Sequence, residues 1–212
     1  PFVADKLSDY YDMNRMDEHL VRLLTEKNRT EVMDDVFERV LNKEKLEEVY
    51  RETVVEGSII QQQDENFYLK REGFSQPVYF GNLSNGLKSF VILKMLLERG
   101  ALKEKDVLIL DEPEIHLHPK WQIAYAELVV LLQKAFDLSV VVTTHSPYFL
   151  DAIHLYSIKH KIGDKTNYYL SEMINNQVTM ENVTGNLDMI YKKMSTPIDA
   201  LETLRYELNN GD

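Results

Sequence analysis

Two apolar runs in the middle of the chain, residues 107–110 and 140–144, are rich in Val, Leu and Ile. Between them, residues 120–136 carry apolar side chains at helical spacing. Uninterrupted apolar runs of this length predict strands buried on both faces of a parallel sheet, and a parallel pair needs a crossover connection, usually a helix. The pattern therefore predicts a βαβ unit over residues 107–144.

The pattern on either side of this unit predicts further elements. Residues 9–51 are charged and carry apolar side chains at helical spacing, which predicts a helical arm over residues 1–53, with the main domain over 54–212. Short β-rich segments between 54 and 80 predict a small antiparallel patch. We expect a helix from 84 to a left-handed cap at Gly100. Further expectations are a short helix at 147–152, strands at 158–162 and 168–170, and a helix at 196–209.

Composition removes several classes of protein. The 212 residues include 24 Lys and Arg against 35 Asp and Glu, which gives a net charge of −11. This acidity does not support DNA as a partner, although a local basic patch could still contact phosphates. The chain has no cysteine, no secretory leader pattern and no stretch near the roughly 18 apolar residues that cross a bilayer. A cytoplasmic location without a membrane partner is the default expectation.

Two carboxylates, Asp111 and Glu112, follow the first apolar run directly. Ligands of parallel sheets bind beyond the carboxyl ends of the strands, and adjacent residues there point to different sides. One carboxylate can therefore hold Mg²⁺ while the other faces an attacking water. The alternative is that Asp-Glu-Pro merely begins a loop, with Asp111 capping a turn.

His145 follows the second apolar run and is expected at the same edge of the sheet. An imidazole there can donate a hydrogen bond to a terminal phosphate and respond to charge. A single histidine more often has a structural role, but a position one βα unit after the acidic pair favours a functional one.

The helix expected from residue 84 opens with Ser84, Asn85 and Gly86. Unpaired N–H groups and the helix dipole make such an end an anion site, whereas the simpler reading is that Ser84 caps the helix. Both readings can hold together.

Residues 81–89 nearly match the Walker A pattern G-x-x-x-x-G-K-S, but Leu87 is one residue too many. The insertion turns Lys88 by about 100° around the helix, so we reject this match. No Gly-Lys pair occurs in the 212 residues, so this sequence contains no Walker A loop.

A Leu-Ser-x-Gly helix start, an apolar strand with Asp-Glu-Pro and a strand with Thr-His-Ser follow one another here. This order resembles the C-terminal half of an ATP-binding-cassette-type ATPase over roughly residues 54–155. Residues 110–119 and 143–147 are more narrowly similar to the stand-alone AAA-like group related to RecF, SMC and overcoming-lysogenization-defect proteins. The resemblance implies an α/β fold with the C-terminal half of a P-loop NTPase-like sheet, a helical insertion and the antiparallel patch.

The resemblance also implies Mg²⁺-dependent ATP hydrolysis and assigns roles to matching residues. Asp111 matches the Walker B aspartate that supports Mg²⁺, Glu112 the glutamate that polarises the attacking water, and His145 the switch histidine. Residues 114–119 match the D-loop of the dimer interface. The signature loop, which reaches across a head-to-tail dimer to the γ-phosphate held by the partner, is matched by Ser84, Asn85 and Gly86.

The departures from the family pattern matter as well. Asn85 and Leu87 stand where transporters usually have glycine and often have glutamine, which fits non-transport relatives. Because the Walker A loop is missing, we expect a fragment or a degenerate relative that binds ATP weakly alone. His116 and His118 could suggest a metal pair, but two ligands do not fill a zinc shell, which favours a structural loop.

Two other functions stay open. One is a non-hydrolysing dimerisation or scaffold module derived from such an ATPase. The other is a two-metal nuclease, for which Asp111 and Glu112 lack further acidic partners with evident spacing. We expect a homodimer through the signature and D-loop, with the helical arm as a surface for a protein partner.

Overall fold

The computed structural model describes residues 2–4, 57–62, 66–71, 73–98 and 100–210. The arm predicted for residues 9–51 lies outside these residues. A three-stranded sheet in the order β1-β5-β6 forms the centre, with β1 (Phe2–Ala4) antiparallel to β5 (Val107–Asp111) and β6 (Ser139–Thr143) parallel to it. Residues 2–4, at the start of the segment assigned to the arm, thus pair with the central sheet.

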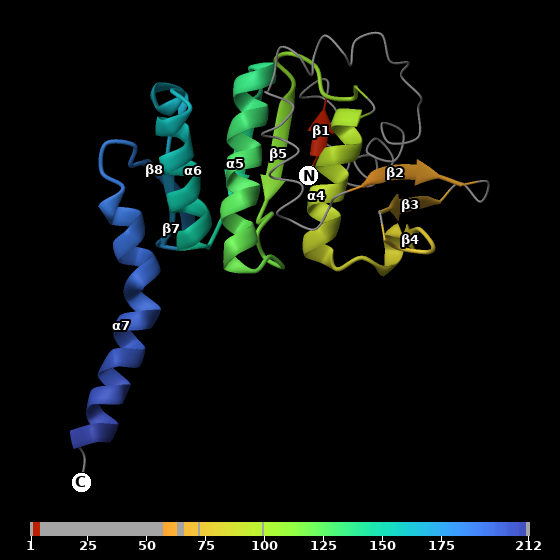
Figure 1. The fold of residues 1–212 in the computed structure, drawn as a ribbon. Coiled ribbons are helices and arrows are strands. Elements are labelled where there is room, and N and C mark those ends of the chain that lie inside the picture. The colour runs from red at the N-terminus through yellow and green to blue at the C-terminus, as the bar shows by residue number, and fades with distance from the viewer. Residues whose placement is uncertain (1, 5–56, 63–65, 72, 99, 211–212) are drawn as a thin grey trace.

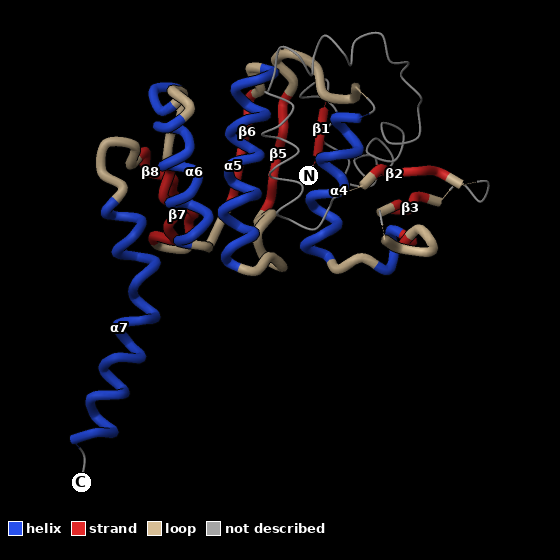
Figure 2. The backbone as a smooth tube through the Cα atoms, viewed as in Figure 1, coloured by secondary structure: helices blue, strands red, loops and turns tan. Residues whose placement is uncertain are grey.

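The parallel pair β5–β6 confirms the predicted βαβ unit. Its register runs from Val107 opposite Ser139 to Asp111 opposite Thr143, and α5 (Pro119–Phe136) is the crossover. Figures 1 and 2 show α5 and α4 (Asn85–Glu98) on the same side of the strands. The two strands therefore end at one edge, with two helices over one face.

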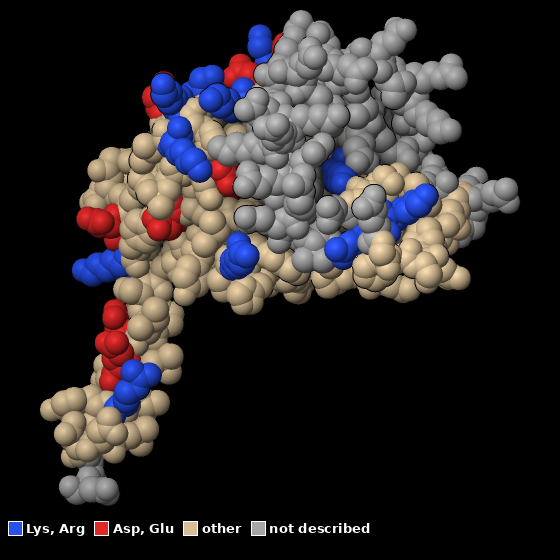
Figure 3. Space-filling view, viewed as in Figure 1, with Lys and Arg blue, Asp and Glu red and all other residues tan. Residues whose placement is uncertain are grey.

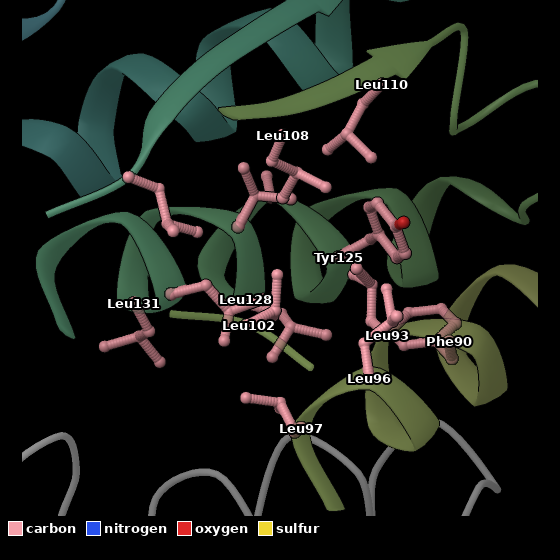
Figure 4. Close-up of a cluster of buried hydrophobic side chains, with 14 of the residues drawn as sticks. Phe90, Leu93, Leu96, Leu97, Leu102, Leu108, Leu110, Tyr125, Leu128 and Leu131 are labelled. Atoms are coloured by element: carbon pink, nitrogen blue, oxygen red, sulfur yellow. The ribbon is translucent and has the colours of Figure 1, made fainter. Parts of the chain in front are cut away.

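The main core lies between these helices and β5. Figure 4 shows leucines of α4, β5 and α5 pointing toward one another around Tyr125. The ring of Tyr125 meets Phe90 edge-on, with centroids 4.9 Å apart. The prediction that both strands are buried on both faces is wrong for β6, where Val141 is 53% exposed. The helices cover one face of that strand, so its side chains alternate between partly buried and exposed.

The predicted antiparallel patch is confirmed by three short strands in the order β2-β3-β4. They are β2 (Ser58–Gln61), β3 (Phe67–Lys70) and β4 (Val78–Tyr79), and the 3-10 turn η2 (Phe80–Asn82) leads from them into α4. Gly100 ends the α4 region with φ of +61°, and Ala101 donates its N–H to the carbonyl of Leu96 at 2.9 Å. The left-handed cap expected at this glycine is therefore present.

Helix α6 (Pro147–Lys159) is longer than predicted. Ser146 caps it by accepting the N–H of Phe149 at 3.3 Å, and Pro147 at the first turn fits its start. The strand predicted at 158–162 is wrong, because the helix continues to Lys159 and the chain then turns at Lys161, whose φ is +62°. The 3-10 turn η3 (Gly163–Lys165) follows.

A hairpin and a long helix complete the chain. β7 (Tyr169–Ile174) confirms and extends the strand predicted at 168–170, and β8 (Gln177–Asn182), which was not predicted, pairs with it. The final helix α7 (Asp188–Asn210) begins eight residues before the predicted start at 196 and continues through Pro197. Within the described residues, none of the helices combines the length and the apolarity that a bilayer crossing requires.

Candidate active site

The ends of β5 and β6 bring the predicted site residues to one edge of the sheet. Asp111 lies opposite Thr143 in the parallel register, and the Thr143 hydroxyl donates to the Asp111 carboxylate. The backbone N–H of Glu112 donates to the Thr143 hydroxyl at 3.0 Å and to its carbonyl at 3.2 Å. Thr143, which sequence reasoning did not single out, therefore fixes both acidic residues.

His145 contacts Glu112 directly. Its Nε2 lies 3.1 Å from the Glu112 Oε1, and the imidazole is 89% exposed. Glu112 has φ of +40°, a left-handed conformation that residues other than glycine rarely adopt. Such strained residues cluster at functional sites, where surrounding bonds hold them in place. Here the Glu112 N–H is held by the two hydrogen bonds that it donates to the hydroxyl and the carbonyl of Thr143.

A buried carboxylate supports the exposed pair. Glu114 is 4% exposed, and its Oε1 accepts the N–H of His145 at 3.2 Å and the hydroxyl of Thr144. Ser146 in turn donates its hydroxyl to Gln122 of α5. Sequence reasoning placed Glu114 only within residues 114–119, and no local signal in the chain distinguishes it from an exposed turn residue.

The start of α4 packs against the turn that follows β5. Ser84 accepts the N–H of Leu87 at 3.4 Å, so the capping reading is correct for its hydroxyl. A Cβ built on Gly86 would lie 2.6 Å from the carbonyl oxygen of His116 and 2.8 Å from a side-chain carbon of Leu117. Glycine is therefore required here by close packing. Within the described residues, no hydrogen bond joins Ser84, Asn85 or Gly86 to Asp111, Glu112 or His145.

The histidine pair and the near-match to the Walker A pattern both have structural explanations. His118 caps α5 by accepting the N–H of Lys120 at 3.3 Å, and the described part of the chain holds no group of three or more His, Asp or Glu that could bind a metal. Lys88 lies in α4 with its ammonium group 5.9 Å from the centre of the Phe80 ring. The near-match to Walker A is therefore a helix start rather than a phosphate loop.

The donor set at this edge suits Mg²⁺. Asp111 is an exposed carboxylate at a strand end with a hydroxyl beside it, and Mg²⁺ is usually held by one or two protein oxygens together with waters and substrate phosphates. Oxygen ligands of this kind do not favour zinc. The edge therefore fits a site that a nucleotide and a metal complete together.

The parallel strands β5 and β6 end in an Asp-Glu pair and a histidine at one edge, which is the arrangement that the sequence motifs predict. A family model described as "AAA domain, putative AbiEii toxin, Type IV TA system" matches residues 5–151. The chain belongs to this family, and its relationship is to ATPases of the stand-alone AAA-like kind.

Two curated proteins are similar to parts of the chain. Septu protein PtuA of Bacillus thuringiensis is 30% identical over 114 residues, which is 47% of this chain and 28% of PtuA. Elongation factor 3B of Saccharomyces cerevisiae is 30% identical over 135 residues, which is 61% of this chain and 12% of that protein. The chain thus matches less than a third of the length of either relative.

Solved structures of SMC heads also align with the chain. One, from work on ATP-driven dimerization and DNA stimulated activation of SMC ATPases, is 13% identical, covers 85% of this chain and 98% of its own, and has a TM-score of 0.45. The SMC head domain from Thermotoga maritima is 15% identical, covers 79% of this chain and 52% of its own, and has a TM-score of 0.40.

Proposed function

We propose that this chain carries the hydrolytic and signature residues of an ATPase that cleaves ATP with Mg²⁺ at the interface of a head-to-tail homodimer. The observation that carries the proposal is the contact between Glu112 and His145 beside Asp111, at the ends of two parallel strands. Membership of an ATPase family supports the same reading.

Each residue at the edge has a task in this proposal. Asp111 holds Mg²⁺, which when bound neutralises charge on the phosphates. Glu112 accepts a hydrogen bond from the attacking water and orients it, and catalysis then rests on positioning and charge stabilisation. His145, whose Nε2 reaches Glu112, is exposed enough to turn toward a γ-phosphate and donate to it.

The start of α4 supplies the second half of a composite site. The first turn of this 14-residue helix has N–H groups without helical partners, and its dipole favours an anion. We assign Ser84, Asn85 and Gly86 to the γ-phosphate bound by the partner. Because Gly86 packs on the turn at 114–119, the signature and the D-loop would meet the partner together.

The proposed division of the chain assigns residues 54–212 to the ATPase part and the segment 1–53 to an arm for a protein partner, except that residues 2–4 of that segment pair with the central sheet. DNA remains the weaker candidate at a net charge of −11. Figure 3 shows basic side chains in separate groups on the visible described face. Binding along a phosphate backbone needs one continuous basic stripe instead.

The test is Glu112→Gln in the protein expressed from its complete coding sequence. ATP affinity should stay within about threefold, whereas turnover should fall about 10²–10⁴-fold, the usual loss when a positioned base is removed. Glu104→Gln, an exposed acid on the loop before β5, is the matched control and should keep full turnover. Unchanged turnover in Glu112→Gln would exclude the assigned role.

A dimerisation module without hydrolysis is the second candidate, and the lack of any Gly-Lys pair in the 212 residues favours it. Sedimentation of the 212-residue chain with and without ATP and Mg²⁺, alongside phosphate release, separates the two. ATP-dependent dimers without phosphate release, from both this chain and the protein of the complete coding sequence, would support the module. Phosphate release that depends on Glu112 would support the ATPase.

A further inference from the structure

Glu114 is buried and lies two residues after Glu112, which contacts the exposed His145. Its Oε1 accepts two hydrogen bonds from the loop after β6, from the N–H of His145 and from the Thr144 hydroxyl. Its Oε2 is buried without a hydrogen-bond partner within the described residues. A buried carboxylate oxygen without a partner costs stability, so a glutamate at this position needs an explanation other than folding.

His145 depends on such an anchor. Its side chain is 89% exposed and reaches only Glu112 among the described residues, so packing does not fix the imidazole. The position of the ring is set instead by the backbone of residue 145. Its N–H donates to the Glu114 Oε1 at 3.2 Å, which ties residue 145 to a buried side chain.

The turn that contains Glu114 also packs against the start of α4. Gly86 packs against the backbone of His116, and the N–H of Leu117 donates to the Glu114 carbonyl at 2.8 Å. Gln122 ties the same turn to the loop after β6, because its amide donates to the Leu117 carbonyl at 3.0 Å and accepts from Ser146. A continuous set of contacts thus leads from Gly86 to His145.

We propose that Glu114 is a positioning residue that holds the backbone of His145 so that its imidazole contacts Glu112. Glu114 also links this geometry to the packing of α4 on the turn at 114–118. The role in turnover rests on the proposed ATPase function. The anchoring of His145 does not, since it concerns the free protein.

The first experiment measures amide hydrogen exchange in the free 212-residue chain. His145 and His116 are both exposed loop histidines, but the N–H of His116 has no acceptor within the described residues. After correction for intrinsic rates, the His145 amide should exchange at least about tenfold more slowly than the His116 amide. Equal rates would overturn the proposal without any variant being made.

Two substitutions then separate anchoring from general stability. Glu114→Ala removes the acceptor and should remove the extra protection of His145, whereas Glu114→Gln keeps an oxygen that can accept both bonds and should retain most of it. Gln133→Ala is the matched control, because Gln133 is a partly buried side chain with one unpartnered oxygen and a bond to the Leu138 carbonyl at the far end of α5. Loss of protection in Gln133→Ala as well would refute a specific anchor.

The link to the signature helix has a spectroscopic test. Gly86→Ala displaces the backbone at His116 and should shift the His145 amide resonance in the native background. The same change should leave that resonance in place when Glu114 is Ala. If Glu114→Ala does not fold, Thr144→Val, which removes one donor to Glu114, replaces it and should weaken the shift. An equal shift in both backgrounds would overturn the link.

The consequence for turnover is measured in the protein expressed from its complete coding sequence. Glu114→Ala should lower kcat by about 10–100-fold, the range seen for residues that orient a reacting group, with KM for ATP little changed, and Glu114→Gln should recover most of kcat. A rise in KM alone would overturn the positioning role. Absence of turnover in the native protein, with His145 protection intact, would defeat the ATPase proposal and leave the anchor standing.

Discussion

Eight of the 18 residues of α5 are buried, whereas one of the 23 residues of α7 is. Helix α5 lies beside β5 and between α4 and α6, so apolar side chains on several of its sides find partners (Figure 1). In α7, only side chains at the beginning of the helix find such partners. Ile190 packs with Leu150, Tyr168 and Val183, and the rest of the helix extends away from the body.

A leucine side chain therefore contributes differently to the free energy of unfolding in the two helices. Leu201, Leu204 and Leu208 continue the spacing of three and four residues set by Ile190 and Met194, yet all three leucines are exposed. The fold that carries the candidate active site draws its stability from the body around α5. The apolar side chains of α7 beyond its first turns contribute little to it.

Leu128→Ala should have the largest effect on folding. This side chain of α5 is fully buried, and removing it leaves a cavity in the main core at a cost of about 2–5 kcal/mol in the free energy of unfolding. Urea denaturation followed by circular dichroism measures the loss. A cost below about 1 kcal/mol would mean that the core near α5 is loosely packed.

Gly86→Ala should be the next most costly change. The added carbon would overlap the His116 carbonyl, and a forced shift of packed backbone costs about 1–3 kcal/mol. Gly163→Ala is the matched control, because a Cβ there meets nothing closer than 3.6 Å and should be tolerated. Equal stability of the two variants would contradict the close packing of α4 on the turn that follows β5.

The sequence predicts the body well because its signals are local and periodic. Apolar runs and the helical spacing between them define β5, α5 and β6, and parallel pairing then brings Asp111, Glu112 and His145 to one edge without any knowledge of side-chain contacts. Glu114 could not be predicted in the same way. Its burial depends on Thr144 and His145, about thirty residues later in the chain, and a glutamate in a turn otherwise indicates exposure.

The C-terminal region shows where periodicity misleads. The isoleucines at 158 and 162 suggest a strand, but the helix begun by Ser146 and Pro147 runs into this segment and ends only at Lys159. Pro197 suggests a helix start, whereas α7 begins at Asp188. The hairpin had a usable signal in Asn175 and Asn176, which take φ of +51° and +61° in the turn between β7 and β8.

The contact between the body and α7 should respond to alkaline pH. Burial raises the pKa of Tyr168 from 10.0 to about 12. Because the folded state favours the protonated phenol, the free energy of unfolding should be level below about pH 10 and fall as the pH rises toward 12. Denaturation at several pH values measures this slope, which should be smaller in Tyr168→Phe. An identical slope in that variant would assign the loss to other groups.

Leu204→Ala should have the smallest effect and is the direct counterpart of Leu128→Ala. Leu204 is 51% exposed, and alanine is at least as good a helix former as leucine, so the free energy of unfolding should change by no more than about 0.5 kcal/mol. Equilibrium denaturation at two protein concentrations measures it. A cost above about 1 kcal/mol that depends on protein concentration would show that another copy covers α7 in solution, and the contrast between the two helices would then hold only for the isolated chain.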